Sequence, residues 1–190
     1  MSFFDDTKNA GLLLLIIALM DIAFVVVAAF FLDQYKDAEM WKKIVLIVGG
    51  VIEGLFLAVV GMGIKNGSCM FQLGGFFSDV TSKFGVLVAG TAAYGIGSII
   101  SGVFSIIAFG TGGITDVVIG VLIVLVAWLM LDGGKVANNI IWIILLIVYI
   151  IGIILSLFAC LVLVGIPSLL LFIMLLLFLL SPEVKSKMGM

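Results

Sequence analysis

The sequence predicts an all-α integral membrane protein, a bundle of six transmembrane helices arranged as three antiparallel hairpins. The composition is 65% hydrophobic and 11% charged, whereas roughly a quarter of the residues of soluble proteins are charged. The apolar residues form runs of about 20 or more, the length that crosses a bilayer as a helix. Polar residues are concentrated in short breaks between these runs. We therefore expect residues 1–190 to form a single transmembrane domain.

Each predicted helix is an apolar run bounded by charged residues, glycine or proline. The first four helices are expected near residues 11–32, 44–64, 84–108 and 114–131.

The apolar stretch at 140–180 is too long for one crossing at about 1.5 Å per residue. Its turn signal is Gly165-Ile166-Pro167-Ser168, because proline cannot continue the hydrogen bonding of a helix. We therefore expect a hairpin there, between helices near 140–164 and 167–180. The last helix is short enough to be a partial span, and a chain with five crossings is the alternative.

The distribution of lysine predicts the orientation. With six crossings both termini lie on one side of the membrane, and that side carries six of the nine lysines: Lys8, Lys65, Lys83, Lys135, Lys185 and Lys187. The opposite side carries Lys36, Lys42 and Lys43. Because cytoplasmic loops are enriched in lysine, we expect a multi-pass protein of the cell membrane with both termini in the cytoplasm.

Two carboxylates lie near the middle of predicted spans, Asp21 in the first helix and Glu53 in the second. A charge at that depth costs about 2.5 to 3.5 kcal/mol on insertion scales. The chain has no histidine or arginine and no lysine at this depth, so each acid must be protonated, hydrogen-bonded or neutralised by a cation. Because consecutive helices run antiparallel, the two acids lie at similar depth. They are either hydrogen-bonding groups between helices or a proton or cation site.

Small residues recur every fourth position of the third helix, at Gly85, Ala89, Ala93, Gly97, Ser101 and Ser105. The second helix has a shorter version, Gly50-x-x-x-Gly54. Such ridges let helix backbones approach closely in lipid, where no hydrophobic force brings helices together. The pattern is typical of packing within one bundle and also of the seam of a homo-oligomer.

Other residues carry weaker signals. Asp116 follows Thr115 at a predicted helix start, where a carboxylate stabilises the free N–H groups. Cys69 and Cys160 fall at different depths and are expected to be free thiols.

The missing residue types exclude several function classes. Without histidine there is no Ser-His-Asp triad and no H-E-x-x-H zinc site, so we expect no enzyme, metal or cofactor. A net charge of -2 without a basic block indicates no nucleic-acid partner. The favoured interpretation is a non-catalytic protein that acts by helix packing in the lipid bilayer, as a homo-oligomer or as an accessory subunit of a membrane assembly. The alternative is a small proton- or cation-coupled transporter or channel that uses Asp21 and Glu53.

Overall fold

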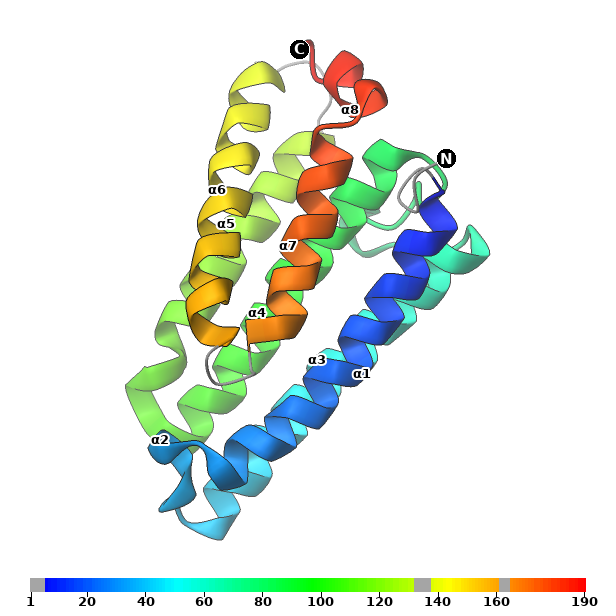
Figure 1. Ribbon diagram of the computed structural model, residues 1–190. Helices are drawn as coiled ribbons and strands as arrows, with labels where there is room; N and C mark the ends of the chain where they lie inside the picture. Colours follow the sequence, from blue (N-terminus) through cyan, green and yellow to red (C-terminus); the bar gives the residue numbers. More distant parts are fainter. Residues whose placement is uncertain (1–5, 132–137, 161–164) are drawn as a thin grey trace.

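The computed structural model describes residues 6–131, 138–160 and 165–190, and all regular secondary structure in these ranges is helical. The elements are α1 (Thr7–Phe31), α2 (Asp33–Lys36), α3 (Met40–Asn66), η2 (Leu73–Gly75), α4 (Lys83–Phe109), η3 (Gly110–Gly113), α5 (Ile114–Leu131), α6 (Asn138–Ala159), α7 (Gly165–Leu179) and α8 (Pro182–Lys187). They form an elongated bundle in which α1 begins and α8 ends at the same end (Figure 1). The short helix α2 lies at the opposite end.

Four helical stretches of the described chain are long and apolar enough to cross a bilayer: Thr7–Phe31, Met40–Asn66, Lys83–Leu131 and Asn139–Ala159. The third stretch has 49 residues and comprises α4, η3 and α5. These apolar helices are compatible with a membrane location.

The predicted helices are present, but some of their ends and one predicted turn differ. The helices predicted near 44–64 and 84–108 are longer at both ends, as α3 and α4. Residues Gly165 to Ser168 were predicted to form the turn of a hairpin, but they are the first turn of α7. Proline is tolerated there because the first N–H groups of a helix have no partner within it. The end of the predicted 140–164 helix, residues 161–164, lies outside the described residues, and α6 ends at Ala159.

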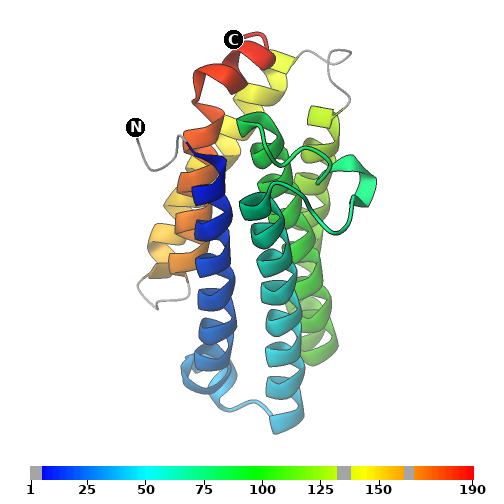
Figure 2. The ribbon, with the colours of Figure 1, turned by 90° about the vertical axis from the view of Figure 1, so that its right-hand side faces the viewer.

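The contacts of α1 with α3 and of α4 with α5 are the most extensive, and α6 packs on α7. The helix α4 also packs along α3, and α1 lies between α3 and α7 when the bundle is turned (Figure 2). The α4 helix is therefore the centre of the bundle, in contact with α3, α5 and α7.

Two pairs of glycines bring α4 and α5 into backbone contact. A Cβ atom on Gly95 would lie 2.8 Å from the carbonyl oxygen of Gly120, and one on Gly120 would lie 2.6 Å from that of Gly95. Gly102 and Gly113 face each other in the same way, and a Cβ on Gly113 would collide with the Gly102 carbonyl oxygen. No side chain other than hydrogen fits at these four positions without displacing backbone.

The α1 and α3 helices approach each other through glycines of both helices. A Cβ on Gly61 would lie 2.9 Å from the carbonyl oxygen of Gly11, and one on Gly54 would lie 3.0 Å from that of Ala18. The contact is closest toward the end at which α1 begins.

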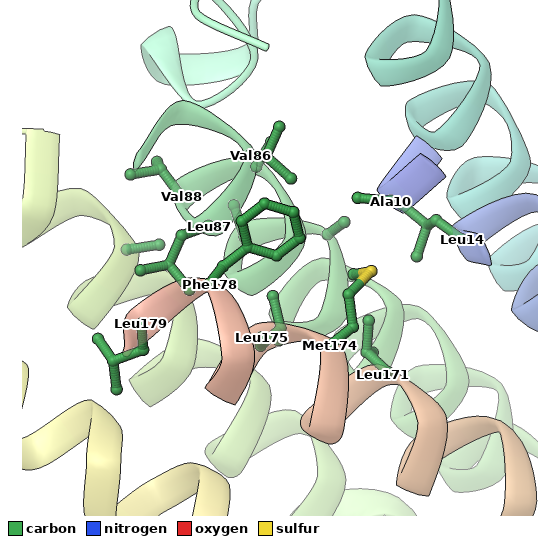
Figure 3. Packing of buried hydrophobic residues seen from close by; sticks show 14 of the residues in the cluster. Ala10, Leu14, Val86, Leu87, Val88, Leu171, Met174, Leu175, Phe178 and Leu179 are labelled. Carbon is green, nitrogen blue, oxygen red and sulfur yellow. The ribbon is translucent and has the colours of Figure 1, made fainter. Parts of the chain in front are cut away.

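The hydrophobic core is richest where α7 crosses α4 near the end at which α1 begins. Figure 3 shows the α7 side chains Leu171, Met174, Leu175, Phe178 and Leu179 against Val86, Leu87 and Val88 of α4 and Ala10 and Leu14 of α1, and all ten are buried. A buried hydrogen bond adds to this packing, since the Thr91 and Tyr149 hydroxyls lie 2.6 Å apart and join α4 to α6.

The segment between α3 and α4 folds back onto the bundle. Phe76 and Phe77 belong to the buried core, and Asp79 accepts hydrogen bonds from Thr81 and Ser82 just before α4 begins. Burial raises the pKa of Asp79, but these hydrogen bonds outweigh it and hold the pKa below its usual range.

We expect Gly113→Ala to lower the free energy of unfolding by about 1 to 3 kcal/mol, the usual cost of overpacking. The neighbouring Gly112→Ala is the matched control, because its added methyl group meets nothing within 4 Å and should change stability by less than about 0.5 kcal/mol. Unfolding by SDS in mixed micelles measures both variants. Equal stability of the two would contradict the close contact between α4 and the start of α5.

Candidate functional site

A cavity of about 350 Å³ lies within the bundle, lined by residues of α1 to α5 and α7. Its most distinctive feature is that three carboxylates line it, each from a different helix: Asp21 of α1, Glu53 of α3 and Asp116 of α5. Two of these acids, Asp21 and Glu53, are the mid-span carboxylates of the sequence. Their helices pack directly on each other, which places both acids on the same cavity.

Glu53 is held between α3 and α4. Its side chain is half-buried and lies against Gly97, where a Cβ atom would be 3.0 Å from Glu53 Oε1. The Ser101 side chain, one turn further along α4, lies near enough to the Glu53 carboxyl group to stabilise its charged form. Gly97 therefore leaves the space that Glu53 occupies, and Ser101 supplies a polar partner for it.

Asp21 is half-buried near the middle of α1. Within the described part of the chain its carboxylate takes part in no hydrogen bond and no ion pair. No fully buried side-chain nitrogen or oxygen of the described residues lacks a partner, so the Asp21 oxygens must remain accessible from the cavity.

Asp116 lies in the first turn of α5, at the end of the bundle where α2 lies. It is exposed. The Tyr35 ring of α2 packs on Phe109 with ring centroids 5.1 Å apart, and burial together with the nearby Asp116 charge raises the pKa of the Tyr35 hydroxyl. Since Gln34 and Tyr35 both line the cavity, it extends to the α2 end of the bundle.

Aromatic and hydroxyl side chains complete the walls. The Tyr94 ring lies edge-on to Phe172 of α7 with centroids 4.8 Å apart, and Ser98 donates a hydrogen bond of 3.0 Å to the Tyr94 carbonyl oxygen. Phe24 and Val25 of α1 add apolar surface. The walls are therefore partly aromatic and partly acidic.

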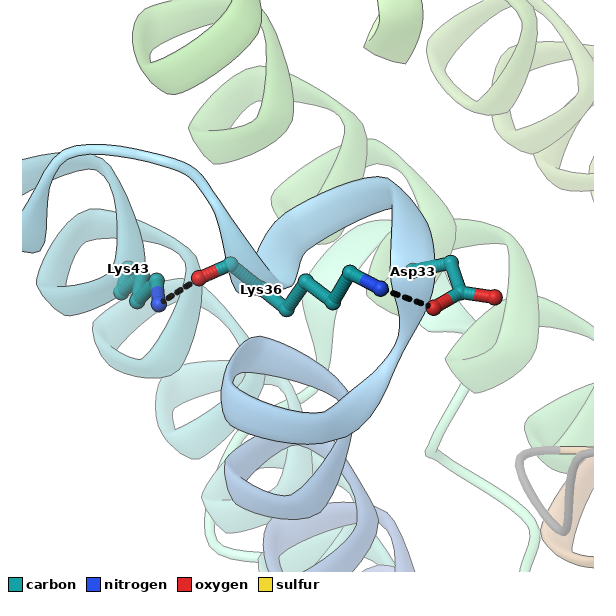
Figure 4. A network of polar contacts seen from close by, with 3 residues as sticks. All are labelled: Asp33, Lys36 and Lys43. Carbon is teal, nitrogen blue, oxygen red and sulfur yellow. Dashed lines mark hydrogen bonds and ion pairs between the residues drawn. The ribbon is translucent and has the colours of Figure 1, made fainter.

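None of the lysines in the described ranges lines this cavity. The lysines at the α2 end are engaged elsewhere. Lys36 pairs with Asp33 at 2.7 Å, and Lys43 donates to the Lys36 carbonyl oxygen at 2.5 Å (Figure 4). Lys42 pairs with Glu39 at 3.8 Å. The three acids consequently have no basic partner among the described residues. No three His, Cys, Asp or Glu side chains of the described chain form a cluster that could hold a metal ion.

The ridge of small residues on α4 faces the interior of the bundle along most of its length. Gly85, Ala89, Ala93 and Gly97 are buried, and Ser101 and Ser105 are half-buried. Gly85 lies against Asp79, and Gly97 lies against Glu53. In α3, Gly50 packs against Val25 and Gly54 against Ile22, both on α1.

The sequence interpretation missed two features of this region. Asp116 was interpreted only as a residue of a helix start. The signal that could have identified it as a site residue was its position as an acid in an apolar run. The glycine pairs between α4 and the η3–α5 segment lie off the predicted ridge. Their signal is a spacing of seven residues on both sides, from Gly95 to Gly102 of α4 and from Gly113, the last residue of η3, to Gly120 of α5.

A second cavity of about 430 Å³ lies at the opposite end, beside Asp79 and Lys187. Its charged groups already have contacts, because Asp79 binds the start of α4 and Lys187 Nζ lies 4.5 Å from the centre of the Phe84 ring. The cavity with three unpaired acids is therefore the better candidate for a functional site.

Comparisons of the chain with protein-family models, with curated proteins and with solved structures find no match.

We expect Gly97→Leu to destabilise the bundle by about 1 to 3 kcal/mol, because the new side chain needs the space of Glu53. Val103→Leu is the control on the same helix, since Val103 is 41% exposed and can accept a methylene group. Thermal unfolding in detergent compares the two variants. A Gly97→Leu protein as stable as the Val103→Leu protein would contradict the packing of Glu53 on α4.

Proposed function

We propose that this chain is a small proton- or cation-coupled membrane transporter or channel whose ion-binding groups are Asp21 and Glu53, with Asp116 at the entrance. The observation that carries the proposal is the convergence of three carboxylates without a basic partner on one cavity. Acids at membrane depth are tolerated when they face water or protein and carry a proton or a cation. Packing alone requires neither a cavity of this size nor unpaired acids.

The proposed topology is a multi-pass protein with six crossings and both termini in the cytoplasm. The stretch Lys83–Leu131 is 49 residues long, and its two helices α4 and α5 pack on each other, so it would cross twice. The α7 helix has 15 residues, or about 22 Å, which is shorter than a hydrocarbon core of about 30 Å. As the sixth crossing it would therefore be a short span, supported by its contacts with α4 and α6.

The cavity suggests one route for the ion. Its α2 end is lined by Gln34 and Tyr35, and this end would face outward. Toward the cytoplasmic end, α1 and α3 are in backbone contact at Gly11 and Gly61. An ion would therefore enter past α2, reach Asp21 and Glu53, and leave only when α1 and α3 separate.

A second candidate function is the packing role favoured by the sequence, in an oligomer or a membrane assembly. Its support is the small-residue ridge of α4. Because the buried part of that ridge already contacts segments of the same chain at Asp79 and Glu53, less of it is left for a partner. We therefore rank this role below ion binding.

Labelling of single cysteines tests the topology. In a Cys69→Ala, Cys160→Ala background, we expect Gln34→Cys to react with a membrane-impermeant maleimide on intact cells, and Ser186→Cys to react only after lysis. Both sites are exposed in the folded chain, so folding does not limit the reaction. Equal labelling of both sites on intact cells would rule out the six-crossing orientation.

Ion flux tests the role of the acids. We expect proteoliposomes of the wild type to carry protons or monovalent cations down an imposed gradient, and Asp21→Asn and Glu53→Gln to abolish this flux. Both isosteric variants should change stability by less than about 1 kcal/mol, in line with single hydrogen bonds in membranes. Asp37→Asn is the control, because Asp37 is an exposed acid that does not line the cavity. Absence of wild-type flux under every gradient would leave the packing role.

A further inference from the structure

The cavity is larger than an inorganic ion requires. Its volume of about 350 Å³ falls within the range of roughly 300 to 1,000 Å³ that is typical of small-molecule sites, whereas one water molecule occupies about 30 Å³ in the liquid. A bare cation would leave most of this space to water.

The carboxylates are also poorly arranged for a hard metal cation. Calcium takes six to eight oxygen ligands at about 2.3 to 2.6 Å, but no three potential ligand side chains of the described residues come together in that way. Acids distributed over α1, α3 and α5 can instead neutralise a cation whose charge is spread over a larger volume.

The walls between the acids are mixed, with aromatic rings beside polar side chains. Phe24, Tyr35 and Tyr94 line the cavity, and Tyr94 is held in place by its edge-on contact with Phe172. The faces of aromatic rings attract ammonium groups within about 6 Å, most strongly where water is excluded. An organic ammonium ion can contact these rings through its apolar groups and can use the carboxylates as counter-charges.

We propose that the ligand of this cavity is an organic ammonium cation with an apolar substituent, bound between the rings of Phe24, Tyr35 and Tyr94 with Asp21 and Glu53 as counter-charges. Asp21 has the free carboxylate that such a ligand needs, because it has no hydrogen-bonding or ion-pairing partner in the described chain. This assignment rests on the proposed function, since it specifies what the same site binds.

Binding of benzyltrimethylammonium tests the assignment on the full-length protein in nanodiscs. The neutral isostere neopentylbenzene has the same shape without the charge, and sodium chloride at equal ionic strength controls for salt. We expect saturable binding of the ammonium compound, measured by calorimetry against empty nanodiscs, and none of the isostere above partitioning into the empty discs. Equal protein-dependent binding of both compounds would overturn the assignment, as would no binding of either.

Variants identify the residues that bind. We expect Asp21→Asn and Glu53→Gln each to weaken binding by at least about tenfold, and Tyr94→Leu to weaken it by roughly tenfold through the loss of one aromatic face. Asp37→Asn should bind as the wild type does. Because the two isosteric acid variants keep the shape of the cavity, they provide a test even if Tyr94→Leu fails to fold. Unchanged affinity in both acid variants would overturn the assignment.

The flux assay and the binding assay test the two proposals separately. Flux of protons or sodium without binding of benzyltrimethylammonium would overturn the organic-cation assignment and leave the proposed function standing. Saturable, acid-dependent binding without any flux would support the assignment and remove the transport role.

Discussion

Close contact between helix backbones at glycine is the constraint on which the rest of this structure depends. In a bilayer, apolar side chains gain little by leaving lipid for protein, so helices associate where their surfaces fit closely and dispersion contacts are dense. Here the contacts of α1 with α3 and of α4 with α5 are made where glycines meet carbonyl oxygens of the facing helix. These contacts set the positions of four helices, and α7 then packs its apolar side chains on α4 and α1.

The candidate site follows from a local change in that packing. At Gly97 the space beside α4 is filled by the Glu53 side chain of α3 rather than by another backbone. Asp21 and Asp116 border the same space from α1 and α5. Because each acid comes from a different helix, any movement that separates α1 from α3 also changes the distance between Asp21 and Glu53. In the proposed function, helix movement would therefore be coupled to ion binding.

The lysines are arranged so that they do not neutralise these acids. At the α2 end, Lys36 and Lys43 have partners within their own segment, Asp33 and a backbone carbonyl. In the proposed function, acids without a basic partner stay available to a mobile proton or cation, which a permanent salt bridge would prevent. The lack of a basic partner also makes these carboxylates energetically costly when no cation is bound. Access to the cavity from one end of the bundle is consistent with this cost, because water can then reach the acids.

Apolar run length alone determined the helices of this protein, because a bilayer requires about 20 apolar residues for each span and leaves few alternatives to a helix. It also determined that Asp21 and Glu53 lie at similar depth, since consecutive helices run in opposite directions. Only the tertiary structure decided that Asp116 borders the same cavity, that residues 165–168 start a helix rather than form a turn, and that Gly95 and Gly102 face α5. The reason is that one-dimensional periodicity places a residue on a face of its helix, whereas the neighbour of that face depends on how backbones fit together over several helices at once.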